Sequence, residues 1–231
     1  MFVNINEALN WLYTQKKQNR RENLDRIKSC AEALDLIPSY KIVHLAGTNG
    51  KGSTAKTLST ILTLANKKVG LFVSPFVIKF NERIQINNEY ISDEKILKYV
   101  NQLFHYQNEY KVKFNDTIPF FELTFLMALM HFKSSNIEIA IIECGMGGRL
   151  DATNFLDSDL SIITNVGFDH MNVLGNTLEE IAYHKLGIAK ENHICLTCVS
   201  NELVNYFDEY AKSYSDIEEL SDLTKLLDDS L

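Results

Sequence analysis

The sequence predicts an α/β fold, a mostly parallel sheet flanked by helices, and three observations support this. Short apolar runs alternate with stretches of helical spacing along nearly the whole chain. A glycine-rich loop follows the first apolar run and leads into a helix-compatible stretch. Polar or glycine-rich segments follow most of the other runs. One rim of a parallel sheet would collect these segments, and ligands bind at that rim in such folds.

Five short apolar runs have the length and composition of buried parallel strands. The segment 76–95 has a different texture, because strand-like alternation surrounds a turn at Asn87-Asn88. It predicts a loop or small hairpin that carries Glu82 and Arg83. The five predicted strands cover residues 42–46, 68–73, 138–142, 160–166 and 193–199.

The spacing of apolar residues predicts helices between these strands and before the first one. Ser92 can cap one of them, Pro119 can occupy the first position of the next, and Thr177 with Glu180 forms a capping box for another. The helix that follows Pro119 is apolar nearly all round, which predicts that it is buried. The predicted helices cover residues 5–15, 22–36, 53–65, 93–110, 119–132, 178–190 and 202–212, and an acidic tail follows at 216–231.

Length and composition indicate one large globular domain. The chain has 231 residues, of which 45% are hydrophobic and 23% charged, and its formal net charge is −7. Nucleic-acid and anionic-membrane binding need clustered Lys and Arg, so this charge argues against both kinds of partner. The amino terminus lacks a signal peptide, and the most apolar stretch, 120–132, is too short to span a bilayer. We therefore expect a cytoplasmic protein.

The four cysteines fit a reducing compartment. Cys195 and Cys198 form a CxxC pair inside a strand-like run, and no second ligand pair accompanies them. We expect core thiols there rather than a zinc or redox site.

The stretch 41–54, KIVHLAGTNGKGST, predicts a phosphate-binding loop between a strand and a helix. Its glycines let backbone N–H groups point inward, the helix adds its positive end, and Lys51 can reach the terminal phosphates. Leu45 stands where a P-loop has its first glycine, and Gly52 where it has the magnesium-binding hydroxyl. Another hydroxyl must hold the metal, or no metal is held; the plain alternative is a βα turn with a chance lysine. The predicted nucleotide-binding residues are Gly47, Thr48, Asn49, Gly50, Lys51, Gly52, Ser53 and Thr54.

Three further side chains are candidates for chemistry. Glu143 ends an apolar strand before a run of glycines, where a carboxylate suits a hard cation such as Mg²⁺; the alternative is a glutamate that caps backbone amides. His170 follows the fourth strand beside Asp169, although a lone histidine is more often structural. Lys185 lies on the capped helix, and its residue context alone favours a surface lysine.

Several segments occur together in one order: GTNGKGST, SPFVIKFNERIQIN, PFFELTFLMA, ECGMGGRLDATN and ITNVGFDHMNVLGNTLEEIAYHKLGIAK. Together they closely resemble the folylpolyglutamate synthase and dihydrofolate synthase family, within the wider Mur ligase group. The resemblance covers the chain from Arg26 to about Val199. It implies a P-loop NTPase-like Mur ligase central domain that binds ATP.

The resemblance also implies roles for particular side chains. Ser74, in the SP motif, would replace the missing P-loop hydroxyl and bind the first Mg²⁺ with Glu143, and His170 would bind a second Mg²⁺. The lysine that matches Lys185 is carbamylated in these ligases, which turns a cation into an anionic oxygen ligand. Catalytic roles fall to Lys51, Lys185 and His170. The substrate site would contain Phe121 as a stacking surface, Asp151 as a hydrogen-bond partner, and Arg83.

The implied reaction is ATP-dependent amide formation. The substrate carboxylate attacks the γ-phosphate to give an acyl phosphate, and the amino group of L-glutamate then displaces phosphate. Three departures from the family pattern stand out. His184 stands in place of a usual glutamate, Pro119 in place of a common threonine, and the chain ends at Leu231, where relatives continue into a second domain.

We therefore expect residues 1–231 to form a single ATP-binding domain, monomeric and without the carboxy-terminal ligase domain. The acceptor, dihydropteroate or a reduced folate, stays open. One alternative is a truncated ATP- or pterin-binding module without ligase activity of its own. Another is a muropeptide ligase, against which Gly52 and the NERI segment argue.

Overall fold

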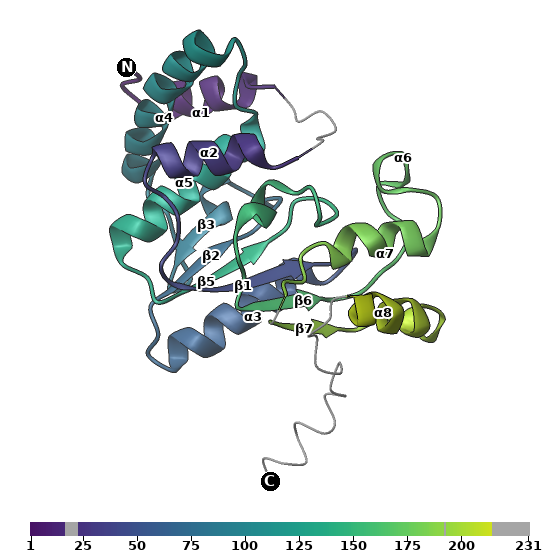
Figure 1. Cartoon of the computed structure of the whole chain (residues 1–231). Helices are drawn as coiled ribbons and strands as arrows, with labels where there is room; N and C mark the ends of the chain where they lie inside the picture. Colours follow the sequence, from purple (N-terminus) through teal and green to yellow (C-terminus); the bar gives the residue numbers. More distant parts are fainter. Residues whose placement is uncertain (17–22, 192, 214–231) are drawn as a thin grey trace.

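A computed structural model describes residues 1–16, 23–191 and 193–213. Figure 1 shows a sheet with helices on both faces, as the sequence predicts. The helices are α1 (Ile5–Thr14), α2 (Asp25–Ala33), α3 (Lys51–Leu64), α4 (Asp93–Phe114), α5 (Phe120–Ser135), α6 (Met171–Leu174), α7 (Leu178–Leu186) and α8 (Asn201–Ser213), with short 3-10 helices η1 (Phe80–Arg83) and η2 (Ala152–Phe155). The strands are β1 (Lys41–Ala46), β2 (Val69–Phe72), β3 (Ile84–Ile86), β4 (Glu89–Tyr90), β5 (Ile139–Glu143), β6 (Leu160–Ile163) and β7 (Ile194–Thr197).

The sheet has seven strands in the order β4-β3-β2-β5-β1-β6-β7. The strands from β2 to β7 in that order pair in parallel, and β3 and β4 add an antiparallel hairpin at one edge. The predicted strands and the hairpin turn at Asn87-Asn88 are confirmed. Because β2, β5, β1 and β6 point the same way, the loops that follow them meet at one rim.

The two faces of the central strands are covered by different helices. On one face, Leu45, Leu71 and Ile141 pack with Ala55 of α3. On the other face, strand residues such as Ile42, Phe72 and Ile142 pack against α5 and the helices around it, including α1, α2 and α4. The predicted burial of α5 is confirmed, because its residues from 122 to 129 are all buried. Both faces of the strands are covered, which explains their continuous apolar runs.

The predicted helix caps are confirmed, but several helix ends differ from the prediction. Ser92 Oγ accepts from Lys95 N at 3.2 Å, and Thr177 and Glu180 form the capping box. Pro119 is the residue before α5 rather than its first residue. Helix α7 ends at Leu186 instead of residue 190, because tertiary hydrogen bonds take over there: Asn154 Nδ2 donates to the Gly187 carbonyl at 2.8 Å. The short helices η1 and α6 were not predicted.

The two cysteines of the CxxC pair have different environments. Cys195 in β7 is buried, so the prediction of a core thiol is confirmed there, and burial raises its pKa to about 12. Cys198 is exposed because it follows the end of β7, so for this residue the prediction is wrong. No helix in the described ranges is long and apolar enough to cross a membrane. The predicted acidic tail at 216–231 lies outside the described residues.

Gly70 in β2 allows α5 to pack closely on the sheet. A Cβ at this position would lie 2.7 Å from Ile137 Cδ1 and 2.8 Å from Phe132 Cδ1. We expect Gly70→Ala to lower the free energy of unfolding by about 1–3 kcal/mol, because an overpacked core must distort. Urea denaturation measures the change. In the control Gly167→Ala the new Cβ would lie 3.7 Å from Thr48 Cγ2, an ordinary contact, and equal losses for the two variants would contradict the prediction.

Candidate functional site

The loop between β1 and α3 has the form of a phosphate cradle. Helix α3 begins at Lys51, two residues earlier than predicted, because Gly50 takes a left-handed conformation with φ of 81°. The early start leaves the first amides of α3 without helical partners and facing the loop. Lys51 Nζ donates to the Gly47 carbonyl at 2.8 Å, so the cation already lies within the loop. This arrangement can bind the phosphates of a nucleotide.

The segment after β6 holds the phosphate loop in shape. Asn165 Oδ1 accepts from Thr48 N at 3.0 Å and from Asn49 N at 2.8 Å, and Thr164 Oγ1 donates to the Asn49 carbonyl at 2.6 Å. Gly47 must be a glycine, since a Cβ there would overlap with Thr164 Oγ1. Thr164 and Asn165 were not among the predicted site residues. The available signal was their position at the end of a strand neighbouring β1.

Glu143 ends β5, Ser74 follows the neighbouring strand β2, and the two residues lie together at the rim. Glu143 Oε2 accepts from Ser74 N at 3.0 Å and lies 3.4 Å from the point where a Cβ of Gly52 would be. Burial raises the pKa of Glu143, while its bond to Ser74 N and the charges of Lys51 and Arg83 oppose that shift. The missing side chain at Gly52 therefore leaves space beside a carboxylate at the start of α3.

A hydroxyl oxygen and a carboxylate suit a hard cation such as Mg²⁺, so this pair fits the ion that the sequence predicts. The described residues contain no group of three or more His, Cys, Asp or Glu side chains that could hold a metal. A Mg²⁺ ion at this place would therefore be bound by a hydroxyl, a carboxylate and phosphate oxygens of the nucleotide, which are common ligands of Mg²⁺. Arg83 contacts Ser74 and is buried. Its Nη1 donates to Ser74 Oγ at 3.1 Å, and its guanidinium carbon lies 5.0 Å from the centre of the Phe76 ring.

One cavity brings together side chains that lie far apart in the sequence. It has a volume of about 460 Å³ and opens beside the end of β5. Among its lining residues are Ser74, Phe121, Asp151 and His170, all of them predicted site residues. Glycines 145, 147 and 148 form part of its wall, so a ligand can approach the backbone closely. An aromatic ring, a carboxylate and backbone amides can bind a flat, polar heterocycle.

His170 and Asp151 have contrasting environments in that cavity. His170 is exposed, takes a left-handed conformation with φ of 48°, and its Nε2 lies 3.6 Å from Asp169 Oδ2. Asp151 is buried, and Asp151 Oδ2 accepts from Met146 N at 3.0 Å. The imidazole is therefore accessible to a ligand from solvent, whereas the carboxylate is held by hydrogen bonds.

Lys185 is buried, so the surface position that its neighbours in the sequence favour is wrong. Only 1% of its surface is exposed, and its amino group forms no hydrogen bond or ion pair within the described part of the chain. Burial and, to a smaller extent, the positive charge of Lys51 together lower the pKa of Lys185 to about 8, against the opposing effect of Asp169. The neutral, nucleophilic form of this amine is therefore more abundant near neutral pH than in a lysine of ordinary pKa.

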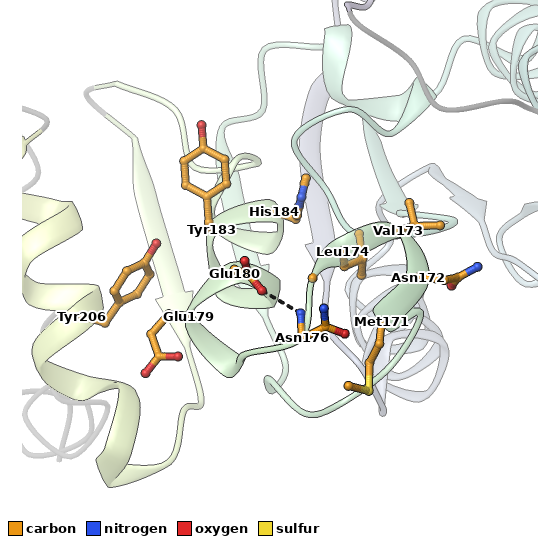
Figure 2. Close-up of a pocket in the computed structure, with 11 residues that line it drawn as sticks. Met171, Asn172, Val173, Leu174, Asn176, Glu179, Glu180, Tyr183, His184 and Tyr206 are labelled. Atoms are coloured by element: carbon orange, nitrogen blue, oxygen red, sulfur yellow. Dashed lines mark hydrogen bonds between the residues drawn. The ribbon is translucent and has the colours of Figure 1, made fainter.

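A second cavity, of about 500 Å³, shares part of its α6 lining with the first (Figure 2). Its walls come from α6, α7 and Tyr206 of α8, and Glu180 Oε2 accepts from Asn176 N at 2.6 Å across its floor. None of the predicted site residues lines it. His184, which departs from the family pattern, lines both cavities. Four predicted site residues therefore meet in the first cavity, whereas Lys51, Arg83, Glu143 and Lys185 are not among its lining residues.

This geometry defines an α/β domain of the P-loop type, with a carboxylate facing the start of the loop helix. The chain belongs to the Mur ligase middle domain family, whose model matches residues 45–218. It is 43% identical over 170 residues to a dihydrofolate synthase/folylpolyglutamate synthase of Haemophilus influenzae, covering 73% of this chain and 37% of the relative. The corresponding protein of Bacillus subtilis is 39% identical over 203 residues, covering 87% of this chain and 47% of the relative.

Solved structures of similar proteins agree with the sequence comparison. A folylpolyglutamate synthase in complex with AMPPCP and folate superimposes with a TM-score of 0.88 at 28% identity, covering 93% of this chain and 53% of that one. A bifunctional enzyme with Mn, AMPPNP and L-glutamate bound gives 0.79 at 31% identity, covering 91% and 50%. The chain therefore spans about half the length of these proteins, and less than half of the two curated relatives.

Proposed function

We propose that this chain supplies the nucleotide- and pterin-binding part of an ATP-dependent ligase that joins L-glutamate to a pterin or folate carboxylate. One observation carries the proposal: Ser74, Phe121, Asp151 and His170 line one cavity beside the phosphate loop. The relatives' names and their bound ligands support the same reaction. We also propose that the protein acts in the cytoplasm and as a monomer, working on small molecules only.

The protein's part in this reaction is to position the reactants and to offset charge. An oxygen of the acceptor carboxylate attacks the γ-phosphorus of ATP, ADP leaves, and the acyl phosphate forms. The amino group of L-glutamate then attacks the acyl carbon, phosphate leaves, and the amide nitrogen loses a proton. Lys51 and the first amides of α3 stabilise the negative charge on the transferring phosphoryl group. Phe121 stacks on the pterin ring and Asp151 accepts its N–H groups.

Two Mg²⁺ ions fit this site as cofactors. Ser74 Oγ and the Glu143 carboxylate would hold one ion, and His170 would hold the second. The chemistry that such ions would supply is partial neutralisation of the negative charge on the phosphates during the transfer. Ser74 Oγ accepts one hydrogen bond from Arg83 and has a second lone pair for a cation, so Arg83 would hold the hydroxyl in place beside the ion.

We propose that Lys185 is carbamylated in the working protein. Its amino group is buried, lacks a hydrogen-bond partner within the described residues and has its pKa lowered to about 8. The neutral amine adds to the carbon of CO₂, loses a proton and becomes a carbamate, whose oxygens can bind Mg²⁺. Because the neutral fraction grows as the pH rises through 8, carbamate formation should increase between about pH 7 and pH 9.

The first test is phosphate release from MgATP by this chain, with L-glutamate and either dihydropteroate or tetrahydrofolate. Mass spectrometry looks for the glutamylated product. Product formation would support ligation by the chain itself and would identify the acceptor. Binding of ATP and pterin in calorimetry without product would favour the alternative, a binding module that needs a further domain, since the chain spans only part of its relatives. Absence of both binding and product would refute the proposal.

We expect Glu143→Gln to abolish Mg²⁺-dependent nucleotide binding, with the affinity for MgATP falling at least about tenfold. Glutamine keeps the shape and the acceptor for Ser74 N but loses the negative charge that a cation needs. Calorimetry with ATP in the presence of Mg²⁺ and of EDTA separates the two effects. The variant should match the native chain in EDTA, and an unchanged affinity in Mg²⁺ would remove Glu143 from the metal site. Glu138→Gln, at the opposite end of β5, is the control.

A further inference from the structure

A row of buried polar side chains connects the middle of the sheet to Asp151. His44 in β1 is fully buried, and its Nε2 lies 2.8 Å from Thr153 Oγ1 in η2. Thr153 Oγ1 donates in turn to Asp151 Oδ1 at 2.7 Å. Cys144 Sγ, just after β5, lies 3.1 Å from the same His44 nitrogen. Burial of a histidine at the centre of a parallel sheet costs free energy that its hydrogen bonds must offset.

The hydrogen atoms of this row can be assigned by counting donors. A carboxylate only accepts, so the single hydroxyl proton of Thr153 goes to Asp151 Oδ1. Thr153 Oγ1 must then accept from His44 Nε2, which makes His44 the neutral tautomer with the proton on Nε2. His44 Nδ1 is left as a bare acceptor, and it has no hydrogen-bond partner in the described structure. The donors therefore run in one direction, from His44 through Thr153 to Asp151.

The Cys144–His44 contact does not make a nucleophilic pair. Burial raises the pKa of Cys144 well above its usual value and lowers the pKa of His44 to about 3. Both groups are neutral, so no thiolate and imidazolium form, and Cys144 is only 1% exposed. The remaining consequence of the row is its hold on the Asp151 carboxylate.

The two oxygens of Asp151 have separate surroundings. Oδ1 accepts from Thr153 N at 3.0 Å as well as from Thr153 Oγ1. Oδ2 accepts from Met146 N, and a Cβ added to Gly145 would lie 3.3 Å from Oδ2 and 2.7 Å from Phe121 Cζ. Oδ2 is therefore on the side of the cavity where Phe121 lies. With Oδ1 held by Thr153, Oδ2 keeps a fixed direction toward the cavity.

We propose that His44 and Thr153 are positioning residues for substrate binding, holding Asp151 so that Oδ2 meets the N–H groups of a pterin ring stacked on Phe121. The proposal rests on the pterin site proposed above. Neither residue touches the substrate. A carboxylate that is already oriented in the free protein does not have to be ordered when the ligand binds, which makes the free energy of binding more favourable. The row therefore increases pterin affinity and leaves nucleotide affinity unchanged.

The test uses the matched pair Thr153→Val and Thr153→Ser in the full chain. Valine keeps the shape and removes the hydroxyl, whereas serine keeps the hydroxyl and removes a methyl group. We expect Thr153→Val to bind dihydropteroate about tenfold more weakly in calorimetry, with MgATP affinity within about twofold of the native chain. Thr153→Ser should stay close to native for both ligands. His44→Gln, which keeps an N–H donor, should bind dihydropteroate more tightly than His44→Leu.

A purely structural role for the row predicts other results. If Thr153→Ser loses as much dihydropteroate affinity as Thr153→Val, or if Thr153→Val loses MgATP affinity in parallel, the proposal is overturned. Hydrogen exchange of the Met146 amide, which donates to Asp151 Oδ2, needs no ligand and should be faster in Thr153→Val than in Thr153→Ser. A native chain that binds neither dihydropteroate nor folate would refute the proposed function. The Met146 exchange rates would then decide the positioning role alone, and equal rates would overturn it.

Discussion

Lys51→Ala should reduce phosphate release from MgATP by at least about a thousandfold, the largest effect we expect from any single substitution. Lys51 Nζ lies within the phosphate loop, 2.8 Å from the Gly47 carbonyl, and its positive charge is within electrostatic reach of Glu143. Without Lys51, no cationic side chain of the loop stabilises the negative charge on the transferring phosphoryl group. Steady-state phosphate release with dihydropteroate and L-glutamate measures the loss, and calorimetry with MgATP should show at least about a tenfold weaker affinity.

The matched control is Lys67→Ala. Lys67 lies before β2, at the opposite end of the strands, in an exposed ion pair with Glu138 of 3.1 Å. Its loss should leave nucleotide affinity unchanged, since exposed ion pairs contribute little to stability. Lys51→Arg keeps the charge but has a wider, planar head group, so it should fall between alanine and the native lysine. Normal turnover of Lys51→Ala would show that the loop does not act on phosphate.

Lys185→Ala should lower turnover by about a hundredfold, and short carboxylic acids should restore part of it. Alanine leaves a buried space, and acetate or propionate can place a carboxylate there in the position of the proposed carbamate. Full activity of Lys185→Ala without added acid would remove the carbamate from the mechanism. Lys51→Ala is the specificity control, since the same acids cannot replace a cation and should not rescue it.

The modification has a direct readout as well. ¹³C NMR of the native chain in ¹³C-bicarbonate should show a carbamate signal that is absent from Lys185→Ala. The signal should grow from about pH 7 to pH 9, because the pKa of Lys185 is lowered to about 8 and only the neutral amine reacts. A lysine of ordinary pKa would react appreciably only at higher pH. A signal that does not depend on Lys185 would assign the carbamate to another amine.

The amino-acid sequence by itself determines the central strands, the longer helices and their order. The apolar runs from 42–46 to 193–199, the alternation with helices and the Asn87-Asn88 turn all reappear in the structure, as do the capping residues Ser92 and Thr177. These features depend on neighbours within one or two turns of the chain, so the local pattern contains the information that decides them. The glycines and the lysine of the phosphate loop can likewise be recognised from the local sequence.

Only the tertiary structure decides the environment of side chains that meet across the sheet. Lys185 reads as a surface lysine along the chain but is buried beside the phosphate loop. Likewise, Thr153 is 109 residues from His44, and Asn165 bonds to Thr48 from 117 residues away. Burial, pKa and hydrogen-bond partners depend on which strands become neighbours, and packing of the whole chain sets that order. The periodicity of a sequence indicates which face of its own helix or strand a residue occupies. It does not indicate which other helix or strand packs against that face.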